Sequence, residues 1–424
     1  MTTMTTTKSN EPLLNTTLKL FMAAMVLANI AGNMVGSLLP LYLKELNASV
    51  VQIGLFFTLS RIFPLVLQII GGWISDMLGR LRSIAIGSIA GVLSYIGLIL
   101  APTWQWVLLS EAWGAMTGSL VGPSFGAFIA EQSSEESRAR VYGITETIFM
   151  LVVVIGPPLG GWIAGAYSFR IMFIASGALY TIATILRISM ARNASQNGES
   201  RAERLTITSL RTKLGAMTAL MLAGGVITWI LITDGVRDIA FSMSFTLMPL
   251  YLDGIGGLSI LQIGWLSTVF GLFNMATTIP AGWLADKKGE RVAIVMGFVL
   301  DASAIVVFLK ADSFWIYAAS WALFGIGVGL MSPAYQSLIS KAVPENLRGT
   351  AFGFLQTSLG LFSLPAPAVG AQLWDRVGPR SPFAITAWIA LLSAIPAWLK
   401  FKLPPEERAP GDHLTPDSPT ETSS

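Results

Sequence analysis

The chain repeats one segment of itself. Residues 52–80, QIGLFFTLSRIFPLVLQIIGGWISDMLGR, align without a gap with residues 262–290, QIGWLSTVFGLFNMATTIPAGWLADKKGE, at an offset of 210 residues, and ten of the 29 pairs are identical. The shared core is G-W-x-x-D-x-x-G, formed by Gly72, Trp73, Asp76 and Gly79 in the first copy and by Gly282, Trp283, Asp286 and Gly289 in the second. An internal repeat of this length indicates a fold built from two similar units.

The composition indicates that lipid is the solvent. Hydrophobic residues make up 53% of the chain and charged residues 12%, whereas soluble domains carry about 25% charged residues. Apolar runs of about 20 residues are long enough to cross the membrane as helices. Helices are expected because lipid cannot hydrogen-bond the backbone, and a helix satisfies its own N–H and C=O groups. We therefore expect an all-α membrane protein with twelve transmembrane helices. They are predicted at 18–43, 51–74, 83–101, 104–130, 140–166, 170–190, 222–251, 261–285, 291–310, 313–340, 349–372 and 381–402.

The repeat extends over both groups of six helices. At the same offset Pro123 pairs with Pro333 and Pro157 with Pro367. At an offset of 209, PLYL at 40–43 recurs at 249–252. Two parallel six-helix bundles follow. The predicted domains are a cytoplasmic N-terminal tail (1–17), a first bundle (18–190), a polar, basic cytoplasmic linker (191–221), a second bundle (222–403) and a disordered cytoplasmic tail (404–424), which is rich in Pro, Ser, Thr and acidic residues.

Basic residues concentrate on one predicted side of the membrane. With both termini in the cytoplasm, 20 of the 27 Lys and Arg, Arg187 among them, lie on the cytoplasmic side and five lie on the other. Arg61 and Arg237 remain inside spans. The positive-inside rule favours this orientation, so we expect a multi-pass plasma-membrane protein with cytoplasmic termini. No signal peptide is expected, and the basic patches are topological, so no nucleic-acid partner is expected.

Three motifs together resemble the major facilitator superfamily over nearly the whole chain. GGWISDMLGRLR and AGWLADKKGER are similar to its loop signature between helices 2 and 3 and the second copy of that loop, and VIGPPLGGWIAG at 154–165 is similar to the helix 5 signature of its drug/proton antiporter branch. Val152 stands where that signature usually begins with a small residue. The resemblance implies two parallel repeats around a central cavity lined by helices 1, 4, 7 and 10.

The resemblance also implies moving parts. The loop Asp of each half is expected to meet a helix N-terminus of the other half, where the helix dipole favours an anion. This would form a conformational latch on the cytoplasmic side. The latch candidates are Gly72, Asp76, Gly79, Arg80, Arg138, Gly282, Asp286, Gly289 and Arg348. The hinge candidates in helix 5 are Gly156, Pro157, Pro158, Gly160 and Gly161. The alternative for the latch residues is a charge cluster that only fixes the topology of the loops. The alternative for the helix 5 residues is ordinary packing of small residues in a membrane helix.

Ionisable residues inside spans are costly and point to function. Helix 7 carries Asp234, Arg237 and Asp238 at helical spacing, so the three can interact. They are proton or substrate candidates, and a structural ion pair is the alternative. Asp238 aligns with Asn29 of helix 1, and Asn33 lies one turn further.

Glu111 departs from the family pattern. Many exporters of the family carry Arg in helix 4 twelve residues before a Pro, and here Glu111 stands twelve residues before Pro123. A carboxylate there could bind protons or a cationic substrate, with Arg61 as its partner, or the two could form a structural pair. Histidine does not carry the proton, because His413 in the tail is the only one. Secondary candidates are Glu146, Asp301, Trp113, Asn274, Gln336 and Gln356.

These observations predict a secondary transporter that works by alternating access, not an enzyme. The expected function is proton-coupled efflux of a small amphipathic or cationic compound by a monomer, with no metal and no cofactor beyond the proton gradient. The alternatives are proton-coupled uptake of a metabolite and a transporter-like receptor or scaffold. The chain shows no nucleophile–histidine pair, metal cluster or nucleotide loop.

Overall fold

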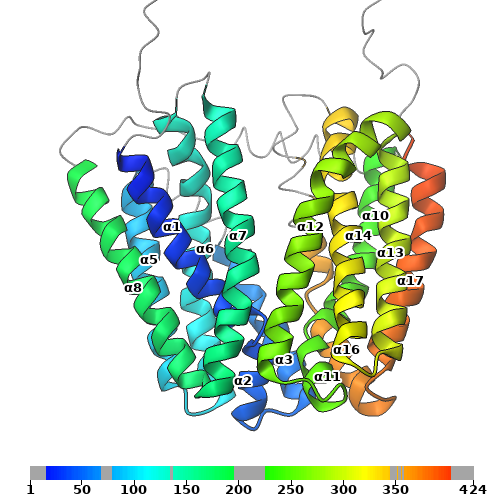
Figure 1. Ribbon diagram of the computed structural model, residues 1–424, viewed down its shortest axis with the longest axis horizontal. Helices are drawn as coiled ribbons and strands as arrows, with labels where there is room; N and C mark the ends of the chain where they lie inside the picture. Colours follow the sequence, from blue (N-terminus) through cyan, green and yellow to red (C-terminus); the bar gives the residue numbers. More distant parts are fainter. Residues whose placement is uncertain are drawn as a thin grey trace, which may run out of the picture.

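A computed structural model describes residues 16–67, 79–133, 137–194, 225–343, 351, 355 and 358–402. These residues form helices and no strand (Figure 1). In the first half the helices are α1 (Thr16–Gly36), α2 (Leu39–Glu45), α3 (Val50–Ser60), α5 (Arg80–Leu100), α6 (Trp104–Gln132), α7 (Arg138–Ala166) and α8 (Phe169–Ala194). In the second half they are α10 (Val226–Phe245), α11 (Met248–Gly254), α12 (Ile260–Lys288), α13 (Glu290–Lys310), α14 (Phe314–Ala342), α16 (Ala366–Arg376) and α17 (Ser381–Lys400).

The first crossing of each half is broken, although the sequence predicts a continuous span. α1 ends at Gly36 before α2, and α10 ends at Phe245 before α11. Each break lies four residues before a proline, Pro40 or Pro249, which lacks the N–H that would bond the carbonyl of Gly36 or Phe245. The proline of the repeated PLYL segment therefore sets the same break twice.

Nine of the described helices are long and apolar enough to cross a membrane by length and composition. α6 and α10 are not among them, although both belong to the bundles. α10 carries three charges in 20 residues, and polar Gln105 and Glu111 lower the mean hydropathy of α6. The fold is nevertheless the expected one, two six-helix bundles arranged as parallel repeats. The predicted domain boundaries remain predictions.

The halves meet through two equivalent helix pairs, α7 with α12 and α3 with α16. Glycine makes both contacts possible. A Cβ added to Gly264 would lie 2.6 Å from the Pro157 carbonyl oxygen, and one added to Gly54, its counterpart in the other half, would lie 2.6 Å from that of Pro367. Thr268 Oγ1 also donates to the Val154 carbonyl across the interface at 2.6 Å. The repeat therefore builds the interface as well as the bundles.

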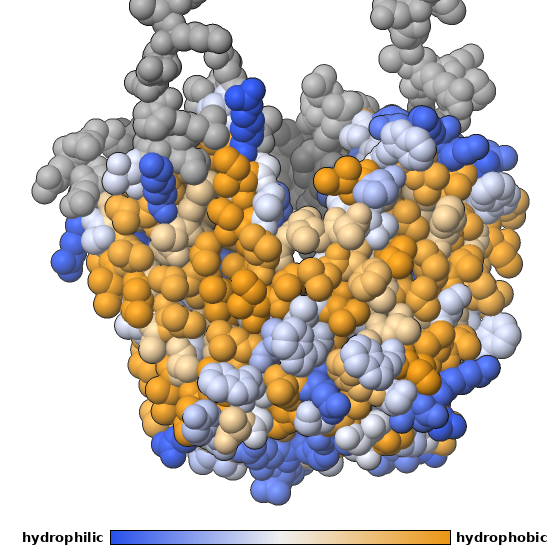
Figure 2. All heavy atoms as spheres, viewed as in Figure 1, coloured by the Kyte–Doolittle hydropathy of each residue, from blue (hydrophilic) through white to orange (hydrophobic). Residues whose placement is uncertain are grey.

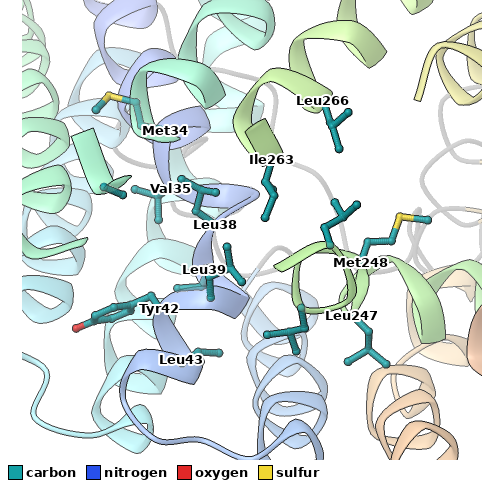
Figure 3. Close-up of a cluster of buried hydrophobic side chains, with 14 of the residues drawn as sticks. Met34, Val35, Leu38, Leu39, Tyr42, Leu43, Leu247, Met248, Ile263 and Leu266 are labelled. Atoms are coloured by element: carbon teal, nitrogen blue, oxygen red, sulfur yellow. The ribbon is translucent and has the colours of Figure 1, made fainter. Parts of the chain in front are cut away.

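One end of the molecule is sealed by apolar side chains from both halves. α1 begins and α17 ends at one face, which we call the terminal face, and α2 and α11 lie toward the opposite face (Figure 1). Apolar side chains of α2 and α11 belong to the buried cluster that forms the seal. Figure 3 shows Leu38 and Leu39 of the first half in one buried cluster with Leu247, Met248 and Ile263 of the second. In Figure 1 the halves diverge from this seal toward the terminal face.

An ion pair and two helix caps accompany the seal. Lys44 Nζ lies 2.6 Å from Asp253 Oδ2, and the two residues hold equivalent positions after PLYL in the two halves. Ser49 and Ser259 each form a capping box, with Gln52 and Gln262 respectively. Opposite charges at a repeated position therefore join the halves at this face.

The outer surface of the bundles is apolar. Figure 2 shows a broad hydrophobic belt with hydrophilic residues gathered toward the two ends. Large side chains such as Trp315 and Ile279 are 79% and 85% exposed. Such exposure indicates that lipid covers this belt.

Candidate functional site

The charged residues of α10 form a network inside the second half. Arg237 Nη2 lies 3.1 Å from Asp301 Oδ2 of α13, and Arg237 Nη1 lies 3.6 Å from Asp234 Oδ1. The guanidinium also lies between the rings of Phe241 and Phe298, 5.0 and 4.9 Å from their centroids. Two carboxylates and two aromatic rings thus hold one cation.

Asp301 is the buried end of this network. Its side chain is fully buried, and Oδ1 has no hydrogen-bond partner among the described residues. It fits because α14 carries Gly327 opposite: a Cβ at that position would collide with Oδ1. A buried carboxylate is stable here only because Arg237 neutralises it.

Asp234 is the end of the network that faces a cavity. Tyr335 of α14 donates from its hydroxyl to Asp234 Oδ1 at 2.8 Å. Both residues line a cavity of about 450 Å³ together with Gln336, Ile230 and Leu359. We call it the acidic cavity. A ligand in it would meet one carboxylate, one phenol, one amide, the hydroxyl of Ser332 and apolar walls.

A second cavity of about 330 Å³ lies between the halves and shares Leu359 with the first. Arg61 follows α3, which ends at Ser60 because Pro64 removes the N–H that would bond the Ser60 carbonyl. Arg61 Nη1 donates to Ser242 Oγ of α10 at 2.9 Å, and Asp238 lines the same cavity. We call it the mixed-charge cavity.

The expected pairing of Arg61 with Glu111 is wrong. No such ion pair occurs between the described residues, and Arg61 instead reaches across the interface to the other half. Glu111 is partly buried on α6. The structure thus separates two residues that the sequence placed at similar depth.

The first half contains a buried arginine that the sequence analysis placed in the cytoplasm. Arg187 of α8 is 1% exposed. Its guanidinium donates to Ser88 Oγ at 2.8 Å, contacts Met25 Sδ at 2.8 Å and lies 5.7 Å from the centre of the Tyr180 ring. Residue 187 falls inside the apolar run 170–190, which indicates a position within the membrane. The charge distribution instead placed Arg187 among the cytoplasmic basic residues.

The asparagines of α1 bond within their own helix. Asn29 Nδ2 donates to the Met25 carbonyl at 2.8 Å, and Asn33 Nδ2 donates to the Asn29 carbonyl at 2.9 Å. Trp113 is 37% exposed, and Glu146 of α7 is exposed. These residues are not joined to the network of α10.

Asn274 lies where α12 and α14 approach closely, beside Gly325 and Gly329. Gln356 lies outside the described residues. Among the secondary candidates, Asp301 and Gln336 are therefore the ones that join the charged network and its cavity.

Only some of the latch candidates lie among the residues that the structure describes. Gly79 and Gly289 have φ values of 87° and 90°, a left-handed conformation that suits glycine. Asp286 is exposed on α12. Gly282 makes no close helix contact, since a Cβ there would meet no atom within 4 Å. Gly72, Asp76 and Arg348 lie outside the described residues, and the side chain of Arg138 is not described. Arg80 is the first residue of α5.

The helix 5 candidates occupy the tightest packing of α7. Gly156 and Gly160 lie against Asn33 and Met34 of α1, while Gly161 lies against Ile260 of the other half. A Cβ added to Gly161 would lie 2.8 Å from the Ile260 carbonyl oxygen. Pro157 and Pro158 lie inside α7. The segment thus contacts its own half on one side and the second half on the other.

No group of three or more His, Cys, Asp or Glu side chains suited to a metal ion occurs in the ranges that the structure covers. The groups that line the two cavities are carboxylates, a guanidinium, a phenol, an amide and serine hydroxyls. Such groups can bind ions, protons and polar ligands.

Comparison with known proteins defines the class. The family model of the Major Facilitator Superfamily matches residues 21–256 and 230–419. The chain belongs to this superfamily, so it is a membrane transporter and not an enzyme.

The curated relatives include multidrug exporters. The chain is 24% identical over 385 residues to the Multidrug resistance protein MdtG of Citrobacter koseri, covering 88% of this chain and 91% of the relative. It is 25% identical to the Multi-drug resistance efflux pump PmrA homolog of Lactococcus lactis (86% and 89% covered) and 25% identical to the Quinolone resistance protein NorA of Staphylococcus aureus (84% and 89% covered).

Solved structures share the fold at low identity. A peptide transporter POT in complex with alafosfalin superposes with a TM-score of 0.71 at 14% identity, covering 90% of this chain and 93% of that one. A bacterial homolog of the human lysosomal transporter Spinster, in an inward-facing and unoccupied conformation, gives a TM-score of 0.71 at 13% identity, covering 92% and 97%. At these identities the likeness shows the fold.

Proposed function

We propose that the protein exports small amphipathic or cationic compounds across the plasma membrane in exchange for protons. The observation that carries this proposal is the network of Asp234, Arg237 and Asp301, whose one cavity-facing acid is Asp234. The similarity to the efflux pump PmrA homolog and to the drug-resistance proteins MdtG and NorA supports efflux. Ionisable residues inside membrane spans are retained for such roles.

The charges of the network support exchange. Asp234 and Asp301 together carry two negative charges when ionised, and Arg237 carries one positive charge. One negative charge remains, at the cavity. Either a proton or a monovalent cationic substrate can neutralise it, and the two compete for the same carboxylate. Competition for one site is the simplest basis for antiport.

The positive-inside rule supports an orientation with both termini cytoplasmic, and we propose that the terminal face is the cytoplasmic face. The halves diverge toward that face (Figure 1), which supports an inward-facing state of alternating access. In that state a latch through Asp286 would be open, and Asp286 is exposed. Glu111, Asn29 and Asn33 remain candidates for the first half of the path.

The transport test uses rhodamine 123, a delocalised cation, and liposomes that contain the purified protein. Antiport predicts accumulation of rhodamine 123 when the vesicle interior is acidic, since protons leave as the cation enters. Symport predicts accumulation when the exterior is acidic, and a receptor or scaffold predicts none in either case. A protonophore and protein-free liposomes give the baseline.

Asp234→Asn is expected to abolish gradient-driven accumulation, while Glu146→Gln, on an exposed residue away from the network, leaves it unchanged. Accumulation by the Asp234→Asn protein at the unaltered rate would show that this acid is not the coupling site. We also propose that the monomer is the transporting unit, because each bundle pair contains both cavities.

A further inference from the structure

Charges from the two halves face each other in the mixed-charge cavity. Arg61 comes from the first half and Asp238 from the second, and Pro64, Leu65 and Leu359 supply apolar walls. Leu359 also lines the acidic cavity, so the two cavities are neighbours. Asp238 lies one helical turn from Asp234, about 6 Å along the axis.

Neither charge is fully satisfied by the protein. A guanidinium has five N–H donors, yet the described residues give Arg61 one hydrogen bond, to Ser242 at 2.9 Å. No ion pair within 4.0 Å joins Arg61 or Asp238 to any described residue. Both residues line the same cavity. Two opposite charges therefore line one cavity without closing on each other.

We propose that this cavity binds zwitterionic compounds, with an anionic group of the ligand on Arg61 and its cationic group on Asp238. The proposal rests on the proposed function in one respect, that transported compounds enter from the terminal face. A carboxylate can accept two parallel hydrogen bonds from a guanidinium. Charges inside a membrane protein are costly unless they are paired, and a zwitterion would pair both at once.

A zwitterion also suits the position of the cavity between the halves. Its two ends would contact Arg61 on one half and Asp238 on the other, so its binding depends on how the halves are arranged. A ligand shifts a conformational equilibrium only if its affinity for the two states differs. A cation without an anionic group would reach Asp238 or Asp234 and leave Arg61 unused.

Rhodamine 110 and rhodamine 123 test this with one chemical change. Rhodamine 110 is the zwitterion with a free aryl carboxylate, and rhodamine 123 is its methyl ester and a simple cation. Dissociation constants for both dyes are measured by fluorescence anisotropy with the full-length protein in detergent. The variants are Arg61→Gln, Arg61→Lys and Asp238→Asn, and a thermal melt confirms that each is folded.

Arg61→Gln is expected to weaken rhodamine 110 by about tenfold or more, the loss of one charge-assisted contact, and to leave rhodamine 123 within about twofold. Arg61→Lys recovers part of the affinity for rhodamine 110. Asp238→Asn weakens both dyes. An equal change in both dyes for Arg61→Gln, or no binding of rhodamine 110 by the unaltered protein, overturns the proposal. Because no gradient is present, the result is independent of whether transport is coupled to protons.

Discussion

Asp301 shows how a single residue depends on its charge partner. It is fully buried, and Arg237 at 3.1 Å is the cation that neutralises it. Removal of one partner leaves an uncompensated buried charge, which costs about 3–5 kcal/mol, whereas apolar replacement of both is often neutral. We therefore expect Arg237→Leu, which leaves both acids without their cation, to lower the melting temperature strongly. Asp301→Leu leaves Arg237 with Asp234 and should cost less, and the double variant should be more stable than Arg237→Leu. A double variant no more stable than Arg237→Leu would contradict a tight Arg237–Asp301 pair.

Gly327 and Gly282 provide a matched pair of glycine substitutions, one at a closed site and one at an open site. A methyl group at Gly327 would collide with Asp301 Oδ1, whereas one at Gly282 would meet no atom within 4 Å. Overpacking a closed site costs about 1–3 kcal/mol. Gly327→Ala is expected to lower the melting temperature, and Gly282→Ala to leave it unchanged. An unchanged melting temperature for Gly327→Ala would show that Asp301 can move aside.

The two acids of the network were not equally visible in the sequence. Helical spacing within one span predicted that Asp234 and Arg237 interact, and the structure places them 3.6 Å apart. The link to Asp301 joins residues 64 positions apart, and sequence spacing carries no information on which helices pack together. For the same reason the sequence paired Arg61 with Glu111, although Arg61 lies against Ser242 of the other half.

At the scale of helices, the apolar runs and the repeat together predicted the spans. α6 and α10 are less apolar than the nine helices that could cross a membrane by length and composition, and the alignment of the two halves supports both. The breaks at Gly36 and Phe245 follow from Pro40 and Pro249 and were not predicted, because the apolar runs continue through them. Prediction of these helix ends therefore requires the missing N–H of proline as well as the pattern of apolar residues.

The contact between α2 and α11 suggests a lock at the opposite face. Lys44 and Asp253 are half-exposed and one-third exposed, so their ion pair contributes little stability. Its position across the seal matters more, because outward opening must separate the two. In a chain with no native cysteine, Lys44→Cys together with Asp253→Cys can be joined by a short bifunctional maleimide. We expect the joined protein to lose gradient-driven rhodamine 123 transport while each single variant, treated alike, retains it. Full transport by the joined protein would show that this face does not open.

At the scale of the whole molecule, orientation and opening can be measured separately. Lys44 is exposed at the opposite face and Gln336 is exposed in the acidic cavity. If the termini are cytoplasmic and the structure is the resting state, a membrane-impermeant maleimide should label Lys44→Cys from outside the cell. It should label Gln336→Cys faster in inside-out vesicles than in right-side-out ones. The Lys44 result fixes which face is outside, so it calibrates the second measurement.

The same pair of measurements links the lock to the resting state. Adding Lys44→Gln to Gln336→Cys removes the charge that holds α2 to α11, and it should raise the labelling rate of Gln336→Cys in right-side-out vesicles. A ligand or substitution shifts such an equilibrium only through a difference between the two states, and the Lys44–Asp253 pair is present in this state. An unchanged outside labelling rate would mean that the apolar seal around Leu38, Leu247 and Met248 holds the opposite face closed without the ion pair. In that case substitutions in the seal, and not in the pair, would control how often the cavity opens outward.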